Sequence, residues 1–437
     1  MFLDETGTPR TIPFKNYKIT PGVGPLAAPY WTIITDSGDK YIFSATEQTR
    51  TDVTTPGIDE YDRDKTFISS WYLTQIISRN GFDVYNFEYT QTTEIQVKTN
   101  SGFNEFRKDM LGSYEPLCAS QEVPPTFSPG PLIFLRQLFL SKISDNHGRV
   151  LDITNVQDRQ DYVGAFRQST IQIKDHLEII RSVSFYNNQY FGSGSETAKR
   201  LKLDRIEITG SDSSEPEVYR FQYNAQNLPD RFSAAQDLWG YFNGSGGGSM
   251  IPSMAGLPGG AERNPSESYT KACNLEMIYY PTGGYEHFVY ELHDAGSTQV
   301  GGLRIKEINW HDDNTSLLKK TVYRYVGQQI TSPLNSTSET YVRVSCGTED
   351  PFPSTCYYVT RFAANRSQLG ASAGIHIGYS QVEEEVRDIL DASGNGKTVY
   401  RFSTPSIATS YPFNPPAFQD AVALGKLLSK KISLLSD

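Results

Sequence analysis

The sequence lacks any apolar run of about 18 residues, the length at which a helix begins to qualify as membrane-spanning. We therefore predict no membrane insertion. The first residues, MFLDETGTPR, also lack the basic and apolar regions of a secretory signal peptide. Either the protein is cytoplasmic, or the chain is an internal piece of a longer secreted protein. The ending LGKLLSKKISLLSD stops inside an alternating apolar stretch, which favours the second interpretation.

Basic residues are outnumbered, because the chain has 40 Lys and Arg against 50 Asp and Glu, a net charge of −10. Nucleic-acid-binding proteins carry a basic surface, so we predict no nucleic-acid partner. The acidity is compatible with solubility and with divalent cations, and it identifies no particular ligand.

Cysteine is scarce, with 4 residues in 437. No Cys-x-x-Cys or Cys/His spacing indicates a zinc site. Cys346 and Cys356 bound the loop CGTEDPFPSTC, which is rich in turn-forming residues and lies between two aromatic-rich segments. These two cysteines are a candidate hairpin disulfide, and the alternative is a pair of thiols.

Aromatic side chains, by contrast, are abundant, with 27 Tyr and 23 Phe against 5 Met. Aromatic and β-branched residues suit a pleated, half-buried sheet surface. The composition therefore favours an all-β protein before any pattern is considered.

A strand–turn–strand module recurs along the chain. Each copy has an alternating apolar strand, a turn rich in Gly, Asn or Asp, and a second strand with alternating aromatics. The copies are WTIITDSGDKYIF (31–43), WYLTQIISRNGFDVYNFEY (71–89), LKLDRIEITGSDSSEPEVYRFQY (201–223), LEMIYYPTGGYEHFVYEL (275–292), LRIKEINWHDDNTSLLKKTVYRY (303–325) and VEEEVRDILDASGNGKTVYRF (382–402). Alternate side chains of a strand share one face, so each aromatic ladder is predicted to form a core face or a sheet-on-sheet interface. We predict an all-β fold of repeated antiparallel β-hairpins in large twisted sheets, with long loops and little helix.

Three further segments bear on the organisation of the chain. The best helix candidate is AFQDAVALGKLLSKK, residues 417–431, although Gly425 interrupts it. The proline-rich stretch 122–133 is a candidate boundary, so we predict an N-terminal region 1–125 and a second region 126–437, or one continuous β-structure. Residues 243–265 are rich in Gly, Ser and Pro and predict a long surface loop.

Several stretches resemble the RHS-repeat or YD-repeat proteins, and more specifically the large RHS-like secreted or surface proteins of Bacteroidota. These stretches are DLWGYFNG (237–244), PTGGYEHFVYE (281–291) followed by GGLRIKEI (301–308), and the hairpin SSWYLTQI…NG…FEY (69–89). The modules here are spaced irregularly, whereas the family repeat has a tight period.

The resemblance implies an extracellular or cell-surface protein whose hairpins build elongated sheets, which in some members curl into a shell around a C-terminal toxin. We accordingly expect a non-catalytic β-scaffold segment of a larger protein, acting in surface structure, adhesion or a shell. Its expected partners are cell-surface glycans, other proteins or flanking parts of its own longer chain. One alternative is a carbohydrate-binding module or carbohydrate-active enzyme on a β-scaffold, and another is a toxin-encapsulating shell segment.

Trp239 and Tyr241 are the candidate ligand-binding residues. By the resemblance they end a strand before a variable Gly/Ser loop; the alternatives are an exposed aromatic platform for a sugar and an engineered linker. Exposure of Trp31, Trp71, Trp239 or Trp310 beside acidic residues would favour the carbohydrate-binding alternative, and burial of all of them would remove its best support.

His287, His293 and His311 are a candidate metal site, because three such ligands suffice to hold zinc or a similar ion. His287 and His293 are separated by about 20 Å along an extended strand, so the chain would have to bend between them. The alternative is that all three are ordinary surface histidines. The oxygen-rich turns HDDN (311–314) and SDNHGR (144–149) are candidates for calcium, with local Asx turns as the alternative interpretation.

The sequence offers no catalytic constellation. GASAG, residues 370–374, matches Gly-x-Ser-x-Gly, but a nucleophile elbow needs a strand before Ser372 and a helix after it. His376 follows too closely to be its base, so the segment is interpreted as a turn of small residues. No P-loop, dinucleotide fingerprint or HExxH motif occurs. We therefore expect no enzymatic activity and no cofactor.

Overall fold

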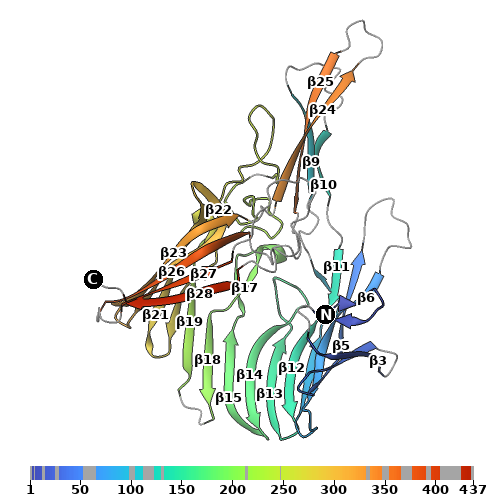
Figure 1. Cartoon of the computed structure of the whole chain (residues 1–437), viewed down its shortest axis with the longest axis vertical. Coiled ribbons are helices and arrows are strands. Elements are labelled where there is room, and N and C mark those ends of the chain that lie inside the picture. Colours follow the sequence, from blue (N-terminus) through green and yellow to red (C-terminus); the bar gives the residue numbers. More distant parts are fainter. Residues whose placement is uncertain are drawn as a thin grey trace. The chain divides into compact units, whose positions relative to one another are not determined.

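The computed structural model describes residues 2–3, 5–11, 15–24, 29–52, 65–97, 104–111, 123–128, 132–211, 215–246, 248–330, 335–346, 354–365, 376–389, 395–403 and 425–434. Antiparallel strands dominate these residues, and helix is confined to a short α-helix, α2 (Glu267–Thr270), and a 3-10 turn (Glu196–Ala198) (Figure 1). The predicted all-β fold is confirmed. Within the described segments, no helix is long and apolar enough to cross a membrane.

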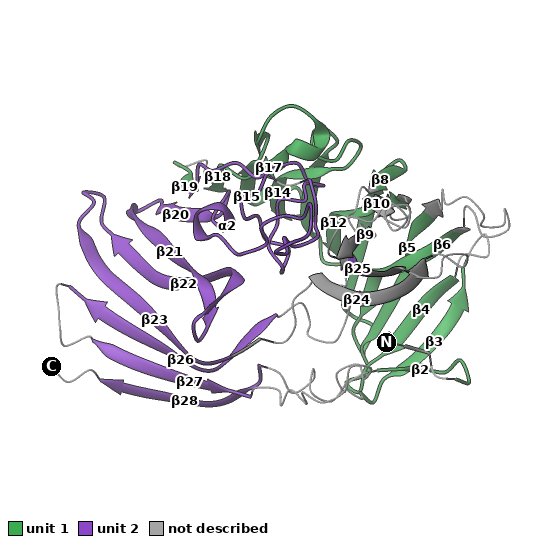
Figure 2. Cartoon of the chain, turned by 90° about the horizontal axis from the view of Figure 1, so that it is seen from above, with its two compact units in different colours: residues 1–99, 131–220 green, residues 100–130, 221–437 purple. Residues whose placement is uncertain are grey.

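The chain forms two compact units, each made of two separate stretches (Figure 2). Unit 1 comprises residues 1–99 and 131–220, and unit 2 comprises residues 100–130 and 221–437. The predicted boundary at 125/126 differs from this division, because strand pairing joins residues from both sides of it.

The main sheet of unit 1 follows the order β3–β4–β5–β6–β7–β12–β13–β14–β15–β18–β19, and β11 pairs with both β5 and β8. The bounds are β3 (Lys18–Val23), β4 (Pro29–Ile34), β5 (Lys40–Asp52), β6 (Lys65–Ile77), β7 (Val84–Gln91), β8 (Ile95–Val97), β11 (Leu132–Arg136), β12 (Leu138–Asp145), β13 (Arg149–Val156), β14 (Arg167–Asp175), β15 (Glu178–Tyr186), β18 (Arg205–Gly210) and β19 (Glu217–Tyr223). Two small ribbons accompany it, β1 (Phe2–Leu3) with β2 (Pro9–Arg10) and β16 (Gln189–Phe191) with β17 (Arg200–Lys202).

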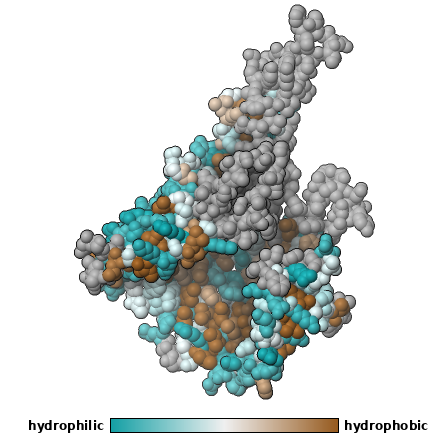
Figure 3. All heavy atoms as spheres, in the orientation of Figure 1, coloured by the Kyte–Doolittle hydropathy of each residue, from teal (hydrophilic) through white to brown (hydrophobic). Residues whose placement is uncertain are grey.

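One face of the unit 1 sheet is apolar because the registers align its apolar positions across neighbouring strands. Ile143 of β12 lies opposite Leu151 of β13, which lies opposite Ile173 of β14. On the other face, Asp152 lies opposite both Lys142 and Gln172. Figure 3 shows hydrophobic residues gathered over the strands that Figure 1 labels β13 to β15.

Unit 2 contains two sheets. The larger follows the order β20–β21–β22–β23–β26–β27–β28, and the smaller follows β10–β9–β25–β24. The bounds are β9 (Asn104–Leu111), β10 (Val123–Ser128), β20 (Leu275–Tyr280), β21 (Gly283–Ala295), β22 (Thr298–His311), β23 (Leu317–Ile330), β24 (Asn335–Cys346), β25 (Ser354–Asn365), β26 (Ile377–Asp388), β27 (Gly396–Phe402) and β28 (Leu427–Leu434). A buried ion pair between Arg361 of β25 and Asp109 of β9, at 2.7 Å, joins two strands of the smaller sheet.

Each predicted strand–turn–strand module forms an antiparallel pair. These pairs are β4–β5, β6–β7, β18–β19, β20–β21, β22–β23 and β26–β27. The aromatic ladders are half-buried rather than fully enclosed, and Tyr85 is 38% exposed. The prediction of a ladder that forms a core face therefore holds only in part.

The ladder tyrosines Tyr89, Tyr290 and Tyr325 donate their hydroxyl groups to backbone carbonyls of a neighbouring strand. Tyr89 donates to the carbonyl of Leu73 at 2.6 Å, and Tyr290 donates to that of Leu275 at 2.8 Å. Tyr325 donates to the carbonyl of Ile305 at 2.6 Å. A half-buried phenol thus satisfies its polar end while its ring covers the sheet.

Two predicted elements are corrected. The helix expected over 417–431 is wrong where the structure describes it, because residues 427–434 form strand β28, paired with β27 from Leu427↔Phe402 to Leu434↔Gly396. Residues 417–424 lie outside the described residues. The segment 243–265 is a loop as predicted, but it is not wholly at the surface, since Met250 and Ile251 are buried.

We predict that Tyr89→Phe lowers the free energy of unfolding by about 1 kcal/mol, because it removes one half-buried hydrogen bond and keeps the ring. The matched control is Tyr85→Phe, whose hydroxyl has no hydrogen bond with any described residue; we expect a change within about 0.5 kcal/mol. Urea denaturation followed by circular dichroism measures both. Equal losses in the two variants would contradict the bonding role of Tyr89.

Candidate functional site

The stretch that carries Trp239 and Tyr241 folds as a tight turn, here called the Asp237 turn (residues 237–241). The Asp237 backbone N–H donates to the carbonyl of Tyr241 at 2.7 Å. The carboxylate Oδ1 of Asp237 accepts the backbone N–H groups of Trp239 at 2.8 Å and of Tyr241 at 3.0 Å. An aspartate at the first position therefore closes the turn by itself, as Asx side chains do.

Trp239 lies in the core of unit 2, with 6% of its surface exposed, packed with Val300 and Ile377. The expectation that it ends a strand is wrong, because the segment is a turn. An exposed sugar platform at Trp239 is excluded by the same burial. The other three tryptophans are half-buried, and two of their indoles donate to protein acceptors: Trp71 to the Pro29 carbonyl, and Trp310 to Glu286.

Buried Arg263 donates hydrogen bonds to the backbone of the Asp237 turn and of the following loop. One guanidinium nitrogen donates to the carbonyl of Asp237 at 2.6 Å, and another donates to that of Met250. The backbone N–H of Leu238 donates in return to the carbonyl of Arg263 at 3.1 Å. One arginine thus connects the turn with the loop that follows it.

The two glycines at the start of GGLRIKEI let the Asp237 turn approach strand β22. A Cβ on Gly301 would lie 2.3 Å from the Asp237 Oδ2 atom. A Cβ on Gly302 would lie 3.0 Å from the Tyr241 ring and 3.2 Å from the His376 ring, and its φ of +90° also disfavours any other residue. The stretches 237–244 and 301–308 are therefore in direct contact.

Next to this contact lies a polar cluster, here called the Arg304 clasp. Arg304 donates to the carboxylates of Glu291 at 2.8 Å and Asp294 at 2.5 Å, and to the Tyr379 hydroxyl at 3.0 Å. His293 Nδ1 lies 2.5 Å from the same hydroxyl. The clasp connects β21, β22 and β26, and each guanidinium nitrogen already has a partner within the protein.

Two neighbouring histidines, half-buried His293 and buried His376, have lowered pKa values. Burial, followed by the nearby His376 ring and the Arg304 charge, lowers the pKa of His293 to about 4. Burial also lowers the pKa of His376, whose Nε2 atom lies 2.6 Å from the Gly301 carbonyl. The two rings pack edge to face with centroids 5.6 Å apart.

The pKa of the Asp237 carboxyl group is shifted in the opposite direction, upward. Burial raises its pKa to about 6, although the N–H groups of Tyr241 and Trp239 stabilise the ionised form. Its Oδ2 atom has no hydrogen-bond partner among the described residues. Desolvation of this oxygen therefore outweighs the two bonds that Oδ1 accepts.

The predicted three-histidine metal site is not formed. His293 belongs to the Arg304 clasp, whereas His311 stacks on Tyr285 at 4.6 Å and its Nδ1 lies 3.1 Å from the Thr315 carbonyl. His287 lies opposite Asn309 in the register of β21 and β22. Among the residues that the structure describes, no group of three His, Cys, Asp or Glu side chains is placed to hold a metal ion.

The oxygen-rich turns that suggested calcium follow the alternative Asx interpretation. Asp312 Oδ1 accepts the Ser316 backbone N–H at 2.7 Å. Asp145 Oδ1 accepts those of His147 at 2.9 Å and Arg149 at 2.8 Å, and its Oδ2 accepts from the Arg149 guanidinium at 2.6 Å. These carboxylates close their own turns.

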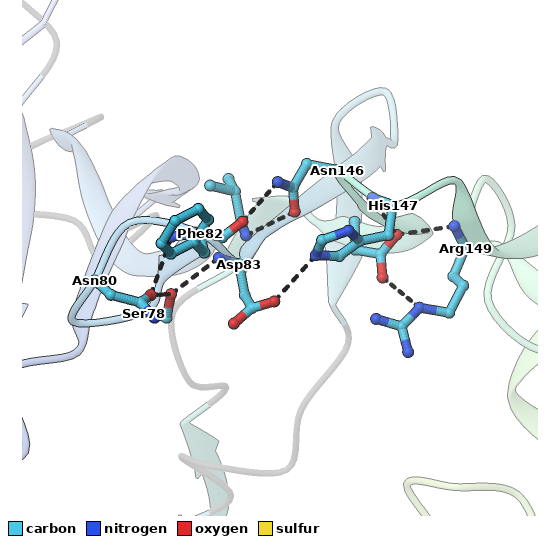
Figure 4. Close-up of polar contacts among 9 residues, drawn as sticks. Ser78, Asn80, Phe82, Asp83, Asn146, His147 and Arg149 are labelled. Carbon is cyan, nitrogen blue, oxygen red and sulfur yellow. Dashed lines mark hydrogen bonds and ion pairs between the residues drawn. The ribbon is translucent and has the colours of Figure 1, made fainter.

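In unit 1, three hairpin turns at one end of the sheet form hydrogen bonds to each other. We call them the turn row; they are residues 78–83 between β6 and β7, 146–148 between β12 and β13, and 176–177 between β14 and β15. Figure 4 shows the turn after β12 facing the turn after β6: Asn146 donates to the Phe82 carbonyl at 2.7 Å, and His147 Nε2 lies 3.0 Å from Asp83 Oδ1. The turn after β14 joins through the His176 N–H, which donates to the Gly148 carbonyl at 2.7 Å.

Beside the turn row, the apolar face of the sheet contains a hollow of about 290 Å³. Its apolar lining is Tyr85, Ile143, Val150, Leu151, Ile173 and Ile180, and its polar lining is Ser144, Asp145, Arg149, Lys174 and Asp175. We did not predict this hollow from the sequence. The available signal was the alternation of aliphatic residues over 149–186, which lies outside the aromatic modules.

Two predictions fall on parts of the chain that are not described. The Gly-x-Ser-x-Gly segment 370–374 lies outside the described residues. The side chains of Cys346 and Cys356 do as well, although the backbone register pairs Cys346 with Ser354 and Cys356 with Val344. The disulfide stays a prediction.

Comparisons with known proteins give little guidance. No protein-family model and no curated protein matches the sequence. Among solved structures, the chain is similar to the N-terminal domain of effector protein SpvB from Salmonella typhimurium strain LT2. The similarity covers 96% of this chain and 98% of that chain, with 9% sequence identity and a TM-score of 0.23. A similarity at this TM-score supports no conclusion about fold or function.

We predict that Gly301→Ala lowers the free energy of unfolding by about 1–3 kcal/mol, the usual cost of overpacking. The added Cβ would meet the buried Asp237 carboxylate at 2.3 Å. Gly248→Ala, at a position with no atom within 4 Å of the new Cβ, is the control and should change little. If both variants lose the same free energy of unfolding, the close approach of Asp237 to Gly301 does not stabilise unit 2.

We also predict that Asp237 makes stability depend on pH. Folding favours the protonated acid, because its pKa is about 6 in the fold and about 4 in the unfolded chain. Its stabilising effect is complete below about pH 4 and is lost as the pH rises to about 6, by up to about 3 kcal/mol. His293 acts oppositely, since its lowered pKa costs stability as the pH falls below about 6.5.

Comparison with Asp237→Asn isolates the Asp237 effect, because His293 is present in both proteins. The free energy of unfolding of this variant, measured relative to the unsubstituted protein, should increase between pH 4 and pH 6.5. A difference that is constant over this interval would show that Asp237 ionises normally.

Proposed function

We propose that the chain is a non-catalytic β-scaffold, a segment of a larger secreted or surface protein of the RHS or YD-repeat type. The observation that carries this proposal is the contact between stretches that resemble that family. The segment 237–244 packs on 301–308 through the Asp237 carboxyl group and Gly301. The strand that contains 283–291 pairs with the strand that contains 303–311.

The bonding of the candidate chemical groups also supports a structural role. The guanidinium group of Arg304 donates hydrogen bonds to Glu291, Asp294 and Tyr379 within the same unit. His293 faces the hydroxyl of Tyr379, and Trp239 is enclosed in the core. These side chains hold strands together, which is the work of a scaffold.

We predict that the protein is labelled on intact producing cells by a membrane-impermeant, amine-reactive biotin reagent, or that it is recovered from the medium. Exposed amines such as Lys430 and Lys431 on β28 are available to the reagent. A cytoplasmic enzyme from the same cells is the control and should be labelled only after lysis. Labelling of both proteins only after lysis would contradict a secreted or surface location.

A glycan array separates the scaffold from the carbohydrate-binding alternative. We expect the folded chain to give no specific signal, with or without calcium ions. Specific binding that Trp310→Phe weakens without altering the circular dichroism spectrum would favour the carbohydrate-binding alternative.

A further inference from the structure

The hollow beside the turn row is an apolar surface that unit 1 leaves accessible. Tyr85, Ile173 and Ile180 are 38%, 40% and 48% exposed. At the tips of the adjoining turns, Phe82 is 73% exposed and Leu177 is 94% exposed. Large apolar side chains gathered at one place in this way are typical of interaction sites.

The hollow has a firm floor. Ile143, Leu151 and Ile173 come from adjacent paired strands, so the backbone ladder fixes their spacing. The hydrogen bonds of the turn row hold the tips of the same hairpins together. The volume of about 290 Å³ lies just below the range for small-molecule pockets, about 300–1,000 Å³. It therefore suits one or two large side chains.

The cations around the hollow are paired with carboxylates, and further carboxylates lie nearby. Arg149 pairs with Asp145 at 2.6 Å, and Lys174 pairs with Asp152 at 2.6 Å, so each of these two cations has a carboxylate partner. The carboxylate of Asp83 pairs with His147, and that of Asp175 pairs with His176 and also lies opposite Arg149 in the register of β13 and β14.

The imidazole rings of His147 and His176 carry a positive charge only when they are protonated. Glu178 adds a further carboxylate at the start of β15, while Arg181 pairs with Glu217 at 3.6 Å. The carboxylates of Asp83, Asp175 and Glu178, here called the acidic rim, therefore give this end of the sheet an excess of negative charge when the histidines are neutral.

We propose that this hollow binds a polypeptide segment of a partner protein, with an apolar side chain in the hollow and a lysine or arginine against the acidic rim. Aliphatic side chains form the floor, so sugar hydroxyl groups would lose hydrogen bonds to water without replacement. An apolar side chain loses none and gains contact. The inference goes beyond the scaffold role and does not depend on it.

Fluorescence anisotropy with labelled synthetic peptides tests the proposal on the whole chain. The probe is Gly-Ser-Lys-Leu-Phe-Lys-Ser-Gly; one comparison peptide has Glu in place of both Lys, and another has Ser in place of Leu and Phe. We expect the peptide without Leu and Phe to bind at least about tenfold more weakly than the probe, since burial of one large apolar side chain contributes on this order. We expect a loss of about tenfold also for the Glu peptide, because its carboxylates would face those of the protein.

Protein variants locate the site. Ile180→Ser should weaken binding of the probe at least about fivefold, which is within the contribution of one buried side chain. Ile432→Ser, at a residue of β28 that is 70% exposed, is the matched control and should leave binding unchanged. The double substitution Asp175→Asn and Glu178→Gln should weaken binding of the lysine probe and spare a peptide with neutral residues in place of Lys. Circular dichroism verifies that each variant is folded.

Several results would overturn the proposal. Failure of the probe to bind would do so, and so would equal affinity for the lysine and glutamate peptides. Loss of binding in Ile432→Ser, with retention in Ile180→Ser, would place the site elsewhere. Sedimentation that shows self-association, abolished by Ile180→Ser, would identify a second copy of this chain as the occupant instead.

Discussion

The larger sheet of unit 2 depends on the close approach of the Asp237 turn to the backbone of β22. Because Gly301 and Gly302 have no side chains, the Asp237 carboxyl group and the rings of Tyr241 and His376 pack directly on the strand. The approach places Trp239 between Val300 and Ile377, so a loop supplies the core of this part of the sheet. The adjoining Arg304 clasp then holds the strands on which the loop rests.

This approach has an electrostatic cost that the structure only partly offsets. The Asp237 carboxyl group accepts two backbone N–H groups, yet burial still raises its pKa to about 6. Desolvation likewise lowers the pKa of half-buried His293 to about 4, which favours its neutral form. Between about pH 4 and pH 6.5 the two groups oppose each other: Asp237 lowers the free energy of unfolding as the pH rises, and His293 lowers it as the pH falls, so their pH dependences partly cancel.

The hairpins were predictable because their signals are local. Alternating residues and a turn fix a pair such as β6–β7 within about twenty residues of sequence, and register follows from the turn. The burial of Trp239 was not predictable, because it depends on Gly301 and Gly302, some sixty residues further along the chain, and on the register that brings them under the turn. Strand β28 was mistaken for helix for a related reason: LLSKKISL has no strong local preference, and pairing with β27 decides its conformation.

The same alternation of residues has different consequences in the two units. In unit 2 the face around Val300 is covered by the loop that contains Trp239, and Val300 is fully buried. In unit 1 the equivalent aliphatic row ends at Ile173, which remains 40% exposed. A shift of one residue in the pairing of β14 would turn Ile173 to the opposite, polar face, so the register that stabilises the sheet also keeps the apolar row together. Because hydrogen bonds of the turn row connect the hairpin tips, a partner that binds the apolar surface would meet side chains whose strands are already held together, which reduces the cost of ordering them.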